Sequence, residues 1–240
     1  MGSSYANTVL YKVEQTETVQ ALFEMGRVAY VSPSCNNFVV VYDQDMASPY
    51  EANLERLEQL SPQSRSLLHQ HHGSPYQSVS AVLAGVLSEK LSCPALSVVV
   101  HDSSQLWYCL CQNGEVLDEY EEGTTTLGKP RVMCEAFELY TPELIQQIET
   151  VLRKSYCDIN NSHQSTTPRL NTLLECDGYE DAMIRHEALA RVLGVSPCWT
   201  VGSDYRAIVM GDMEAFYEDV CFEEDGQLVW EEAQLQLRHS

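Results

Sequence analysis

The sequence predicts an α+β fold with a mixed or mostly antiparallel central sheet around residues 96–120, covered by amphipathic helices. The densest apolar runs of the chain, 96–100 and 105–111, lie in this stretch, and the second run is apolar at both alternating sets of positions. A strand that is apolar on both sides is covered on both sides. The dipeptide Asn113-Gly114 favours a type I′ turn, so residues 115–120 should fold back antiparallel.

A two-residue turn also fixes which residues of the hairpin face each other. We expect Cys111 to face Val116, and the pairing to continue with Leu110 facing Leu117, Cys109 facing Asp118 and Trp107 facing Tyr120. Paired side chains share one face of a sheet. Asp118 beside Cys109 is the one polar exception in this apolar register.

The first third of the chain alternates short strands and helices. We expect strands at 9–13, 28–31 and 38–42, a helix at 18–25 that ends at Gly26, and pairing of the second strand with the third. Ser48 and Pro49 favour the start of an amphipathic helix over 49–60. Residues 61–76 are polar and lack periodicity, which indicates a surface loop. An apolar stripe over 77–92 predicts a helix that covers the central hairpin and stops at Pro94.

A polar linker at 121–130 follows the hairpin and is the first plausible domain boundary. We expect a single domain over 1–240, with two subdomains divided near 121–130 as the alternative. Apolar periodicity predicts helices at 142–154 and 180–193, the second ended by Gly194. Residues 155–178 are polar and irregular, and 207–210 should form a strand that returns to the sheet.

Composition limits the classes of function. The 240 residues include 35 Asp or Glu against 14 Lys or Arg, a formal charge of −21. Such a charge disfavours direct nucleic-acid or anionic-lipid binding and favours basic partners. No apolar run approaches the roughly 20 residues of a membrane helix, and the N-terminus lacks the pattern of a signal peptide. The nine cysteines, spread singly through apolar segments, are typical of reduced thiols. We expect a cytoplasmic protein that does not enter a membrane.

The sequence favours no catalytic centre, cofactor or metal. It contains no GxxxxGK[ST], GxGxxG, GxSxG or HExxH motif. The histidines of the segment HQHH at 69–72 could share a metal, but no thiolate or carboxylate stands at a ligand spacing, so a solvated loop is favoured. Cys109 and Cys111 are expected to be core thiols. His101 and Asp102 resemble a base with its orienting carboxylate, although neighbouring strand residues point to opposite faces.

We therefore interpret the protein as a non-catalytic acidic interaction or regulatory module that binds a basic protein partner. The predicted partner-binding residues are acids of the hairpin and acids and aromatics of the C-terminal segment: Glu115, Asp118, Glu119, Glu121, Glu122, Phe216, Tyr217, Glu218, Asp219, Phe222, Glu223, Glu224, Asp225 and Trp230. Aromatic residues would supply contact area and charges would set association rate and selectivity. A solvated acidic face that only maintains solubility is the simpler interpretation of these carboxylates.

Two other classes remain open. An enzyme could assemble a site around His101 and Asp102, and a DNA mimic or toxin antidote would place its carboxylates in a basic nucleic-acid-binding surface. The segment LWYCLCQNGEVLDEY resembles a hairpin of uncharacterised bacterial proteins, and this resemblance implies no function.

Overall fold

The computed structural model describes residues 4–50, 52, 62, 66–67, 74–154 and 182–210. Its centre is one six-stranded sheet in the order β2-β3-β1-β4-β5-β6, in which every neighbouring pair is antiparallel. The strands are β1 (Tyr5–Tyr11), β2 (Ala29–Val31), β3 (Phe38–Asp43), β4 (Ala95–His101), β5 (Gln105–Gln112) and β6 (Glu115–Glu121). The predicted α+β class is confirmed.

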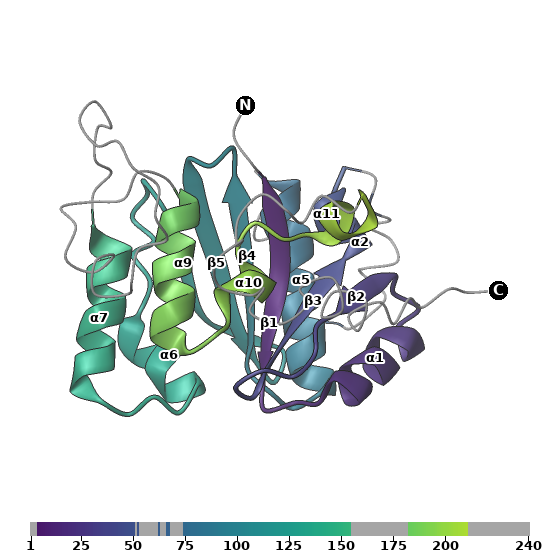
Figure 1. Cartoon of the computed structure of the whole chain (residues 1–240), viewed down its shortest axis with the longest axis horizontal. Coiled ribbons are helices and arrows are strands. Elements are labelled where there is room, and N and C mark those ends of the chain that lie inside the picture. The colour runs from purple at the N-terminus through teal and green to yellow at the C-terminus, as the bar shows by residue number, and fades with distance from the viewer. Residues whose placement is uncertain are drawn as a thin grey trace.

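Helices cover both faces of the sheet, because its inner strands are apolar on both sides. Figure 1 shows α5 (Pro75–Lys90) behind the sheet and α9 (Ala182–Leu193) and α10 (Pro197–Thr200) in front of it. Alternation along β1 illustrates the division: Leu10 faces the core beneath α5, whereas Val9 faces the core beneath α9. The fold is therefore a three-layer sandwich with one apolar core on each side of the sheet.

The core behind the sheet is organised by α5. The Ser74 hydroxyl accepts a hydrogen bond from the backbone N–H of Gln77, and Pro75 occupies the first turn, so the helix begins where its cap and its proline place it. The helix buries almost its whole length against β4 and β5, as the apolar stripe predicted. Two shorter helices, α1 (Gln15–Glu24) and α2 (Gln44–Ala47), complete this layer.

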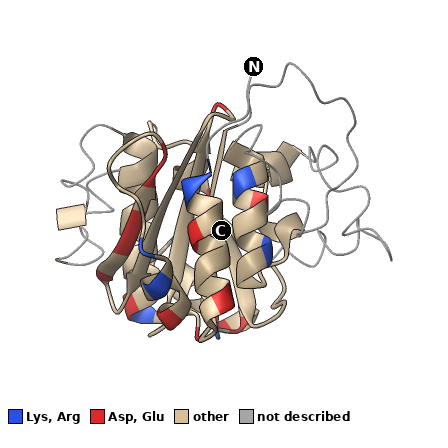
Figure 2. Ribbon diagram, turned by 90° about the vertical axis from the view of Figure 1, so that its left-hand side faces the viewer, with Lys and Arg blue, Asp and Glu red and all other residues tan. Residues whose placement is uncertain are grey.

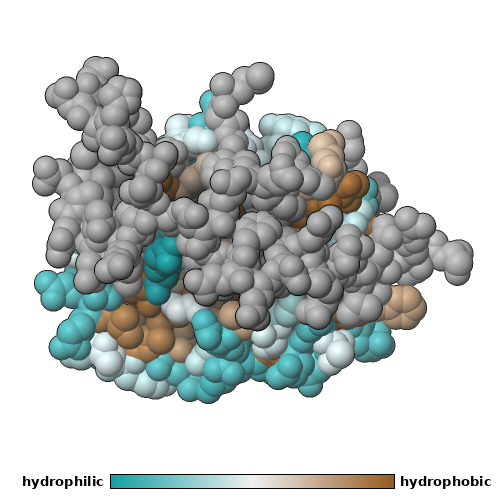
Figure 3. All heavy atoms as spheres, viewed as in Figure 1, coloured by the Kyte–Doolittle hydropathy of each residue, from teal (hydrophilic) through white to brown (hydrophobic). Residues whose placement is uncertain are grey.

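The core in front of the sheet is built by helices from the second half of the chain. They are α6 (Pro130–Ala136), α7 (Pro142–Arg153), α9, α10 and α11 (Tyr205–Met210). Apolar residues of α7 that recur every three or four positions point inward, among them Ile148, Val151 and Leu152. Figure 3 shows hydrophobic side chains gathered low on this face, around the position of α6.

Most of the expected elements are present in the described part of the chain. The strands near 9, 28 and 38 and the helices near 18, 77, 142 and 180 are confirmed, and β2 pairs with β3 as predicted. The predicted helix start at Pro49 is wrong, because residues 49 and 50 form a turn and Ser48 ends α2 instead of capping a new helix. Most of 51–76 lies outside the described residues, but the described Leu67 is buried in the core behind the sheet, which corrects the expected surface loop at that position. The segment 155–178 and the C-terminal segment after residue 210 also lie outside the described residues. None of the described helices combines the length and the apolar composition needed to span a membrane.

The predicted strand at 207–210 is wrong. These residues belong to helix α11, because Asp204 precedes it and its Oδ1 accepts a hydrogen bond from the backbone N–H of Ala207 at 2.8 Å. A short polar cap in front of a short apolar run favours a helical turn over an isolated strand. The helix contacts α2 instead of joining the sheet.

The predicted hairpin register is correct at the turn and wrong beyond it. Asn113 and Gly114 both have positive φ, 52° and 81°, and Cys111 pairs with Val116. Between Leu110 and Cys111 the register shifts, so that one extra residue, Leu117, stands in β6. Beyond this bulge the pairs are Leu110 with Asp118, Cys109 with Glu119, Tyr108 with Tyr120 and Trp107 with Glu121.

Candidate functional site

The predicted hairpin carboxylates lie on β6 and directly after it, at one end of the sheet order. Glu115 is exposed, and the apolar residues Val116 and Leu117 beside it are half-buried. This short stretch combines an outward carboxylate with accessible apolar surface. It is therefore the part of the hairpin best suited to contact another molecule.

Asp118 is buried, with 2 % of its surface exposed. Its Oδ2 accepts hydrogen bonds from the hydroxyl of Tyr108 at 2.9 Å and from the backbone N–H of Lys129 at 2.8 Å. Lys129 is the N-cap residue of α6, and the side chain of Lys129 makes no capping hydrogen bond. Asp118 thus anchors the start of α6 from the sheet, and the bulge at Leu117 explains how a carboxylate reaches these donors.

Glu122 also bonds within the fold, on the same side of the sheet. Its Oε1 lies 2.9 Å from Nη2 of Arg185, and its Oε2 accepts a hydrogen bond from the backbone N–H of Leu106 at 3.1 Å. Arg185 donates as well to the carbonyl of Val151 at 2.5 Å and to that of Lys154. One buried guanidinium therefore joins the end of β6 to the C-terminal carbonyls of α7.

The other two acids face α5. Oε1 of Glu119 accepts a hydrogen bond from the indole N–H of Trp107 at 2.8 Å, and Oε1 of Glu121 accepts one from the amide of Gln77 at 2.9 Å. Both carboxylates are half-buried, so part of their charge still reaches solvent. They lie on the same strand as Glu115, on the face of the sheet that α5 covers.

The structure thus separates the five hairpin acids into two groups. Asp118 and Glu122 bond toward α6, α7 and α9, whereas Glu115, Glu119 and Glu121 are exposed or half-buried, the latter two on the α5 side. The residues predicted in the C-terminal segment lie outside the described part of the chain: Phe216, Tyr217, Glu218, Asp219, Phe222, Glu223, Glu224, Asp225 and Trp230. Partner binding by either set stays a prediction.

His101 ends β4 and Asp102 begins the turn to β5, and the ring centres of His101 and Tyr76 lie 6.0 Å apart. Both residues are exposed, and Asp102 has a positive φ of 50°. The backbone N–H of Asp102 donates to the hydroxyl of Ser4 at 2.8 Å. An exposed turn lacks the enclosure that would tune a catalytic pair.

The described thiols are largely buried in the cores. Burial raises the pKa of Cys93 to about 12, which opposes thiolate formation. The sulfur atoms of Cys109 and Cys111 lie 3.7 Å apart on one face of β5, as their spacing predicted. Cys198 is disulfide-bonded, which corrects the expectation that all cysteines are reduced. Among the described residues no three His, Cys, Asp or Glu side chains are grouped as metal ligands, and the predicted HQHH segment is not described.

A buried polar network crosses the front core, and sequence reasoning missed it. His186 on α9 contacts the Tyr5 hydroxyl through Nδ1 at 2.8 Å and the Thr200 hydroxyl through Nε2 at 3.3 Å. The Thr200 hydroxyl donates to Oδ1 of Asn7 at 3.0 Å, and the Asn7 amide donates to the carbonyls of Thr200 and Ser203. We assign the proton of His186 to Nε2, because the Thr200 oxygen is then an acceptor and every group has a partner.

This assignment makes the imidazole neutral. Burial lowers the pKa of His186 to about 3, because the charged ring would lose its hydration. The network joins β1 to α9 and α10. Its arrangement favours a structural role, in which the side chains fix the front helices to the centre of the sheet.

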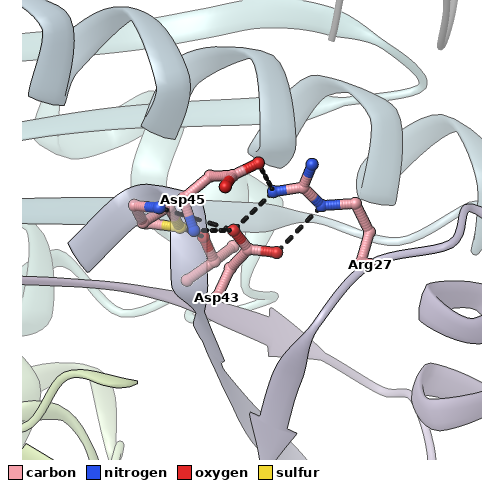
Figure 4. A network of polar contacts seen from close by, with 5 residues as sticks. Arg27, Asp43 and Asp45 are labelled. Atoms are coloured by element: carbon pink, nitrogen blue, oxygen red, sulfur yellow. Dashed lines mark hydrogen bonds and ion pairs between the residues drawn. The ribbon is translucent and has the colours of Figure 1, made fainter. Parts of the chain in front are cut away.

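A second buried network, shown in Figure 4, joins Arg27 to the end of β3. Arg27 makes a two-pronged contact with Asp43, Nε to Oδ2 at 2.9 Å and Nη2 to Oδ1 at 2.5 Å, and Nη2 also lies 2.9 Å from Oδ2 of Asp45. Asp43 caps α2 by accepting from the backbone N–H groups of Asp45 and Met46. The sequence carries a signal for this pair. Arg27 directly precedes the predicted strand 28–31, and Asp43 directly follows the predicted strand 38–42, with which 28–31 was expected to pair.

The charges on the described helices do not form a patch of one sign. Figure 2 shows acidic and basic residues along both α7 and α9, including the ion pairs Arg153–Glu149 and Arg191–Glu187. Uncompensated acids on the described surface are therefore better sought on β6 than on these helices. No protein-family model, curated protein or solved structure matches the chain.

Proposed function

We propose that the protein is a non-catalytic acidic interaction module that receives a basic protein segment at strand β6. The observation that carries the proposal is the position of Glu115, Glu119 and Glu121 on the last strand of the sheet. A terminal strand can pair with an added extended segment, whose side chains then meet those of the strand. Leu127 already bridges Tyr120, so an added segment would pair along the part of β6 that precedes Tyr120. Glu119 and Glu121 pair with Cys109 and Trp107 on the α5 side, whereas Glu115 lies on the other face, so lysines or arginines on both faces of the segment would meet the carboxylates.

The charge distribution supports a basic partner. The chain has a formal charge of −21, and no Lys or Arg occurs between Lys90 and Lys129, a stretch that includes the whole hairpin. The half-buried Val116 and Leu117 provide apolar contact beside the exposed Glu115. In this arrangement the apolar residues supply affinity, and the rim carboxylates mainly increase the association rate and reject acidic competitors.

The same charge argues against nucleic acid as a direct partner, and we propose none. We also propose the cytoplasm as the compartment, because Cys35, Cys93, Cys109, Cys111 and Cys134 are free thiols. The disulfide at Cys198 favours the opposite conclusion. Alkylation of thiols in intact cells, followed by mass spectrometry, distinguishes the two: a largely alkylated Cys198 supports the cytoplasm, and an oxidised one contradicts it.

The experiment that tests the function is capture of partners from native extract by the immobilised full chain. The test variant is Glu115→Gln with Glu119→Gln and Glu121→Gln. Glutamine keeps an oxygen that can accept from Trp107 and Gln77, so the hydrogen bonds survive while three charges are removed. We expect the captured basic protein to associate about threefold to tenfold more slowly with the variant, because electrostatic attraction is weakened.

A matched control removes the same charge elsewhere. Glu135→Gln, Glu138→Gln and Glu143→Gln change three exposed acids outside β6, one on α6, one between α6 and α7, and one in the first turn of α7. Capture by this control should match the native chain. Equal loss in both variants, or loss in neither, would show that the hairpin acids act only through net charge or solubility.

The C-terminal segment is tested separately with Glu223→Gln, Glu224→Gln and Asp225→Asn. If its acids and aromatics contribute to the interaction, capture weakens and becomes less sensitive to salt. Unchanged capture and unchanged salt dependence would assign this acidic cluster to solubility alone.

A further inference from the structure

The end of strand β6 already has a short partner within the chain. Residues 123–128, which we call the strap, follow β6 and turn back along it. The backbone N–H of Glu121 donates to the carbonyl of Thr126 at 2.9 Å, and the carbonyl of Glu121 accepts from the backbone N–H of Thr124 at 3.3 Å. The strap therefore uses both backbone hydrogen-bonding groups of the last residue of β6.

These backbone groups belong to the open side of the strand. The backbone N–H of Glu122 donates to the carbonyl of Leu106 on β5 at 3.0 Å. Because backbone groups of neighbouring strand residues point in opposite directions, those of Glu121 point away from β5. An added segment would use this side of β6. The strap, through the bridge between Leu127 and Tyr120, occupies the end of the same edge.

Both ends of the strap are fixed to buried parts of the fold. Before it, a carboxylate oxygen of Glu122 accepts from the backbone N–H of Leu106 at 3.1 Å, and the other pairs with the buried Arg185 at 2.9 Å. After it, the backbone N–H of Lys129 donates to the buried Asp118 at 2.8 Å. The middle of the strap can therefore move only as a short segment between two fixed points.

The middle of the strap is held more weakly. The hydroxyl of Thr124 donates to the carbonyl of Glu121 at 2.9 Å and accepts from the backbone N–H of Thr126 at 3.1 Å. Leu127 is 58 % exposed, and a Cβ added at Gly123 would have nothing within 4 Å. Exposed hydrogen bonds with little buried apolar surface open at a low free energy. The strap can thus leave the edge of β6 while its two ends stay in place.

We propose that the strap competes with the basic segment for the end of β6 and can be displaced by it, an inference that rests on the proposed function of this strand. While the strap is closed, a segment pairs only along 115–119. A longer segment gains the positions of Tyr120 and Glu121 only when Thr126 releases the backbone N–H of Glu121. The strap therefore makes binding depend on the length of the partner segment.

Hydrogen exchange at the Glu121 amide of the full chain, followed by NMR, measures how often the strap opens. Thr124→Ala removes the hydroxyl that ties the turn and should speed this exchange about twofold to tenfold, the effect of one hydrogen bond. Thr124→Ser keeps the hydroxyl and should exchange like the native chain. Thr125→Ala changes the exposed neighbouring threonine and is the matched control. Unchanged exchange in Thr124→Ala would overturn the proposal.

NMR titration then tests the competition with two peptides of lysine and valine that carry lysines on both faces. One has five residues, the length of 115–119, and the other has seven, the length of β6. We expect Thr124→Ala to bind the longer peptide about twofold to tenfold more tightly than the native chain, and the shorter peptide equally well. None of the substitutions changes the charge, so electrostatic attraction is the same throughout.

The outcomes separate the strap from the function on which it rests. Equal affinity of Thr124→Ala and the native chain for the longer peptide, or an equal gain for both peptides, would overturn the competition and leave binding at β6 intact. Failure of both peptides to bind any of the chains would refute the proposed function, and the role of the strap with it.

Discussion

Gly128 lies where the segment after β6 packs against Tyr108 and Leu152 of the front core, and it tests how the hairpin is joined to α6. A Cβ at this position would lie 2.3 Å from the Tyr108 hydroxyl oxygen and 3.1 Å from Cδ1 of Leu152, and the backbone φ is +68°. The Tyr108 hydroxyl is the donor to buried Asp118. Gly128→Ala must therefore displace a side chain whose hydrogen bond holds the start of α6.

The free-energy cost has two separable parts. A non-glycine residue at positive φ costs about 1–2 kcal/mol. Overpacking adds about 1–3 kcal/mol, and a weakened hydrogen bond to a buried carboxylate adds a comparable amount. Gly123 has a similar φ of +77° but nothing within 4 Å of an added Cβ, so Gly123→Ala carries the first part alone. We expect about 1–2 kcal/mol for Gly123→Ala and about 3–8 kcal/mol for Gly128→Ala.

Urea denaturation measures the free energy of unfolding of both variants and of a double-mutant cycle with Tyr108→Phe. Removing the Tyr108 hydroxyl deletes the 2.3 Å contact, so Tyr108→Phe should be less destabilising in the Gly128→Ala background than alone. Equal costs for the two glycine substitutions, or strict additivity of Gly128→Ala with Tyr108→Phe, would refute this packing.

Two further predictions concern the buried networks. Because the folded pKa of His186 is lowered to about 3 from an ordinary value of 6.5, its contribution to stability is complete above pH 6.5 and is lost as pH falls toward 3. At pH 5 the free energy of unfolding is therefore expected to be about 2 kcal/mol lower than at pH 7. Urea denaturation at pH 7 and 5 should show this loss in the native chain and not in His186→Gln, and equal pH dependence would contradict it. Arg27→Met leaves the buried Asp43 without its partner and should cost about 3–5 kcal/mol. Lys12→Met, which breaks the exposed pair with Glu138, should change the free energy of unfolding little, and similar costs for both would refute the distinction.

The sequence was most informative where local patterns decide structure. Alternating apolar residues in 105–111, followed by Asn113-Gly114, predicted the hairpin and its first pair, because a two-residue turn acts over a few positions. The bulge at Leu117 could not be predicted in the same way. The bulge brings Asp118 to the Tyr108 hydroxyl and to the backbone N–H of Lys129. Lys129 lies after the loop that follows β6, and the residue pattern of the hairpin does not determine the path of that loop.

Contacts between the two ends of the chain were also beyond local reasoning. Tyr5 meets His186 and Asn7 meets Thr200 across 181 and 193 positions of sequence. Burial of His186 gave no local signal, because a histidine within an amphipathic helix is equally compatible with an exposed position. Arg185 was missed for the same reason, although its ion pair with Glu122 determines how the acidic hairpin meets α7 and α9.

Hydrogen exchange at the amides of β6 most directly tests whether this strand receives a basic segment. The probe is a synthetic peptide of alternating lysine and valine, added to the full chain at low salt and at about 0.5 M NaCl, where the Debye length is below about 5 Å. We predict slower exchange in β6 at low salt, no change in the opposite edge strand β2, and a much smaller effect at high salt or in the variant lacking the charges of Glu115, Glu119 and Glu121. Protection that is absent from β6, or that is unaffected by salt and by the three substitutions, would contradict the proposed function.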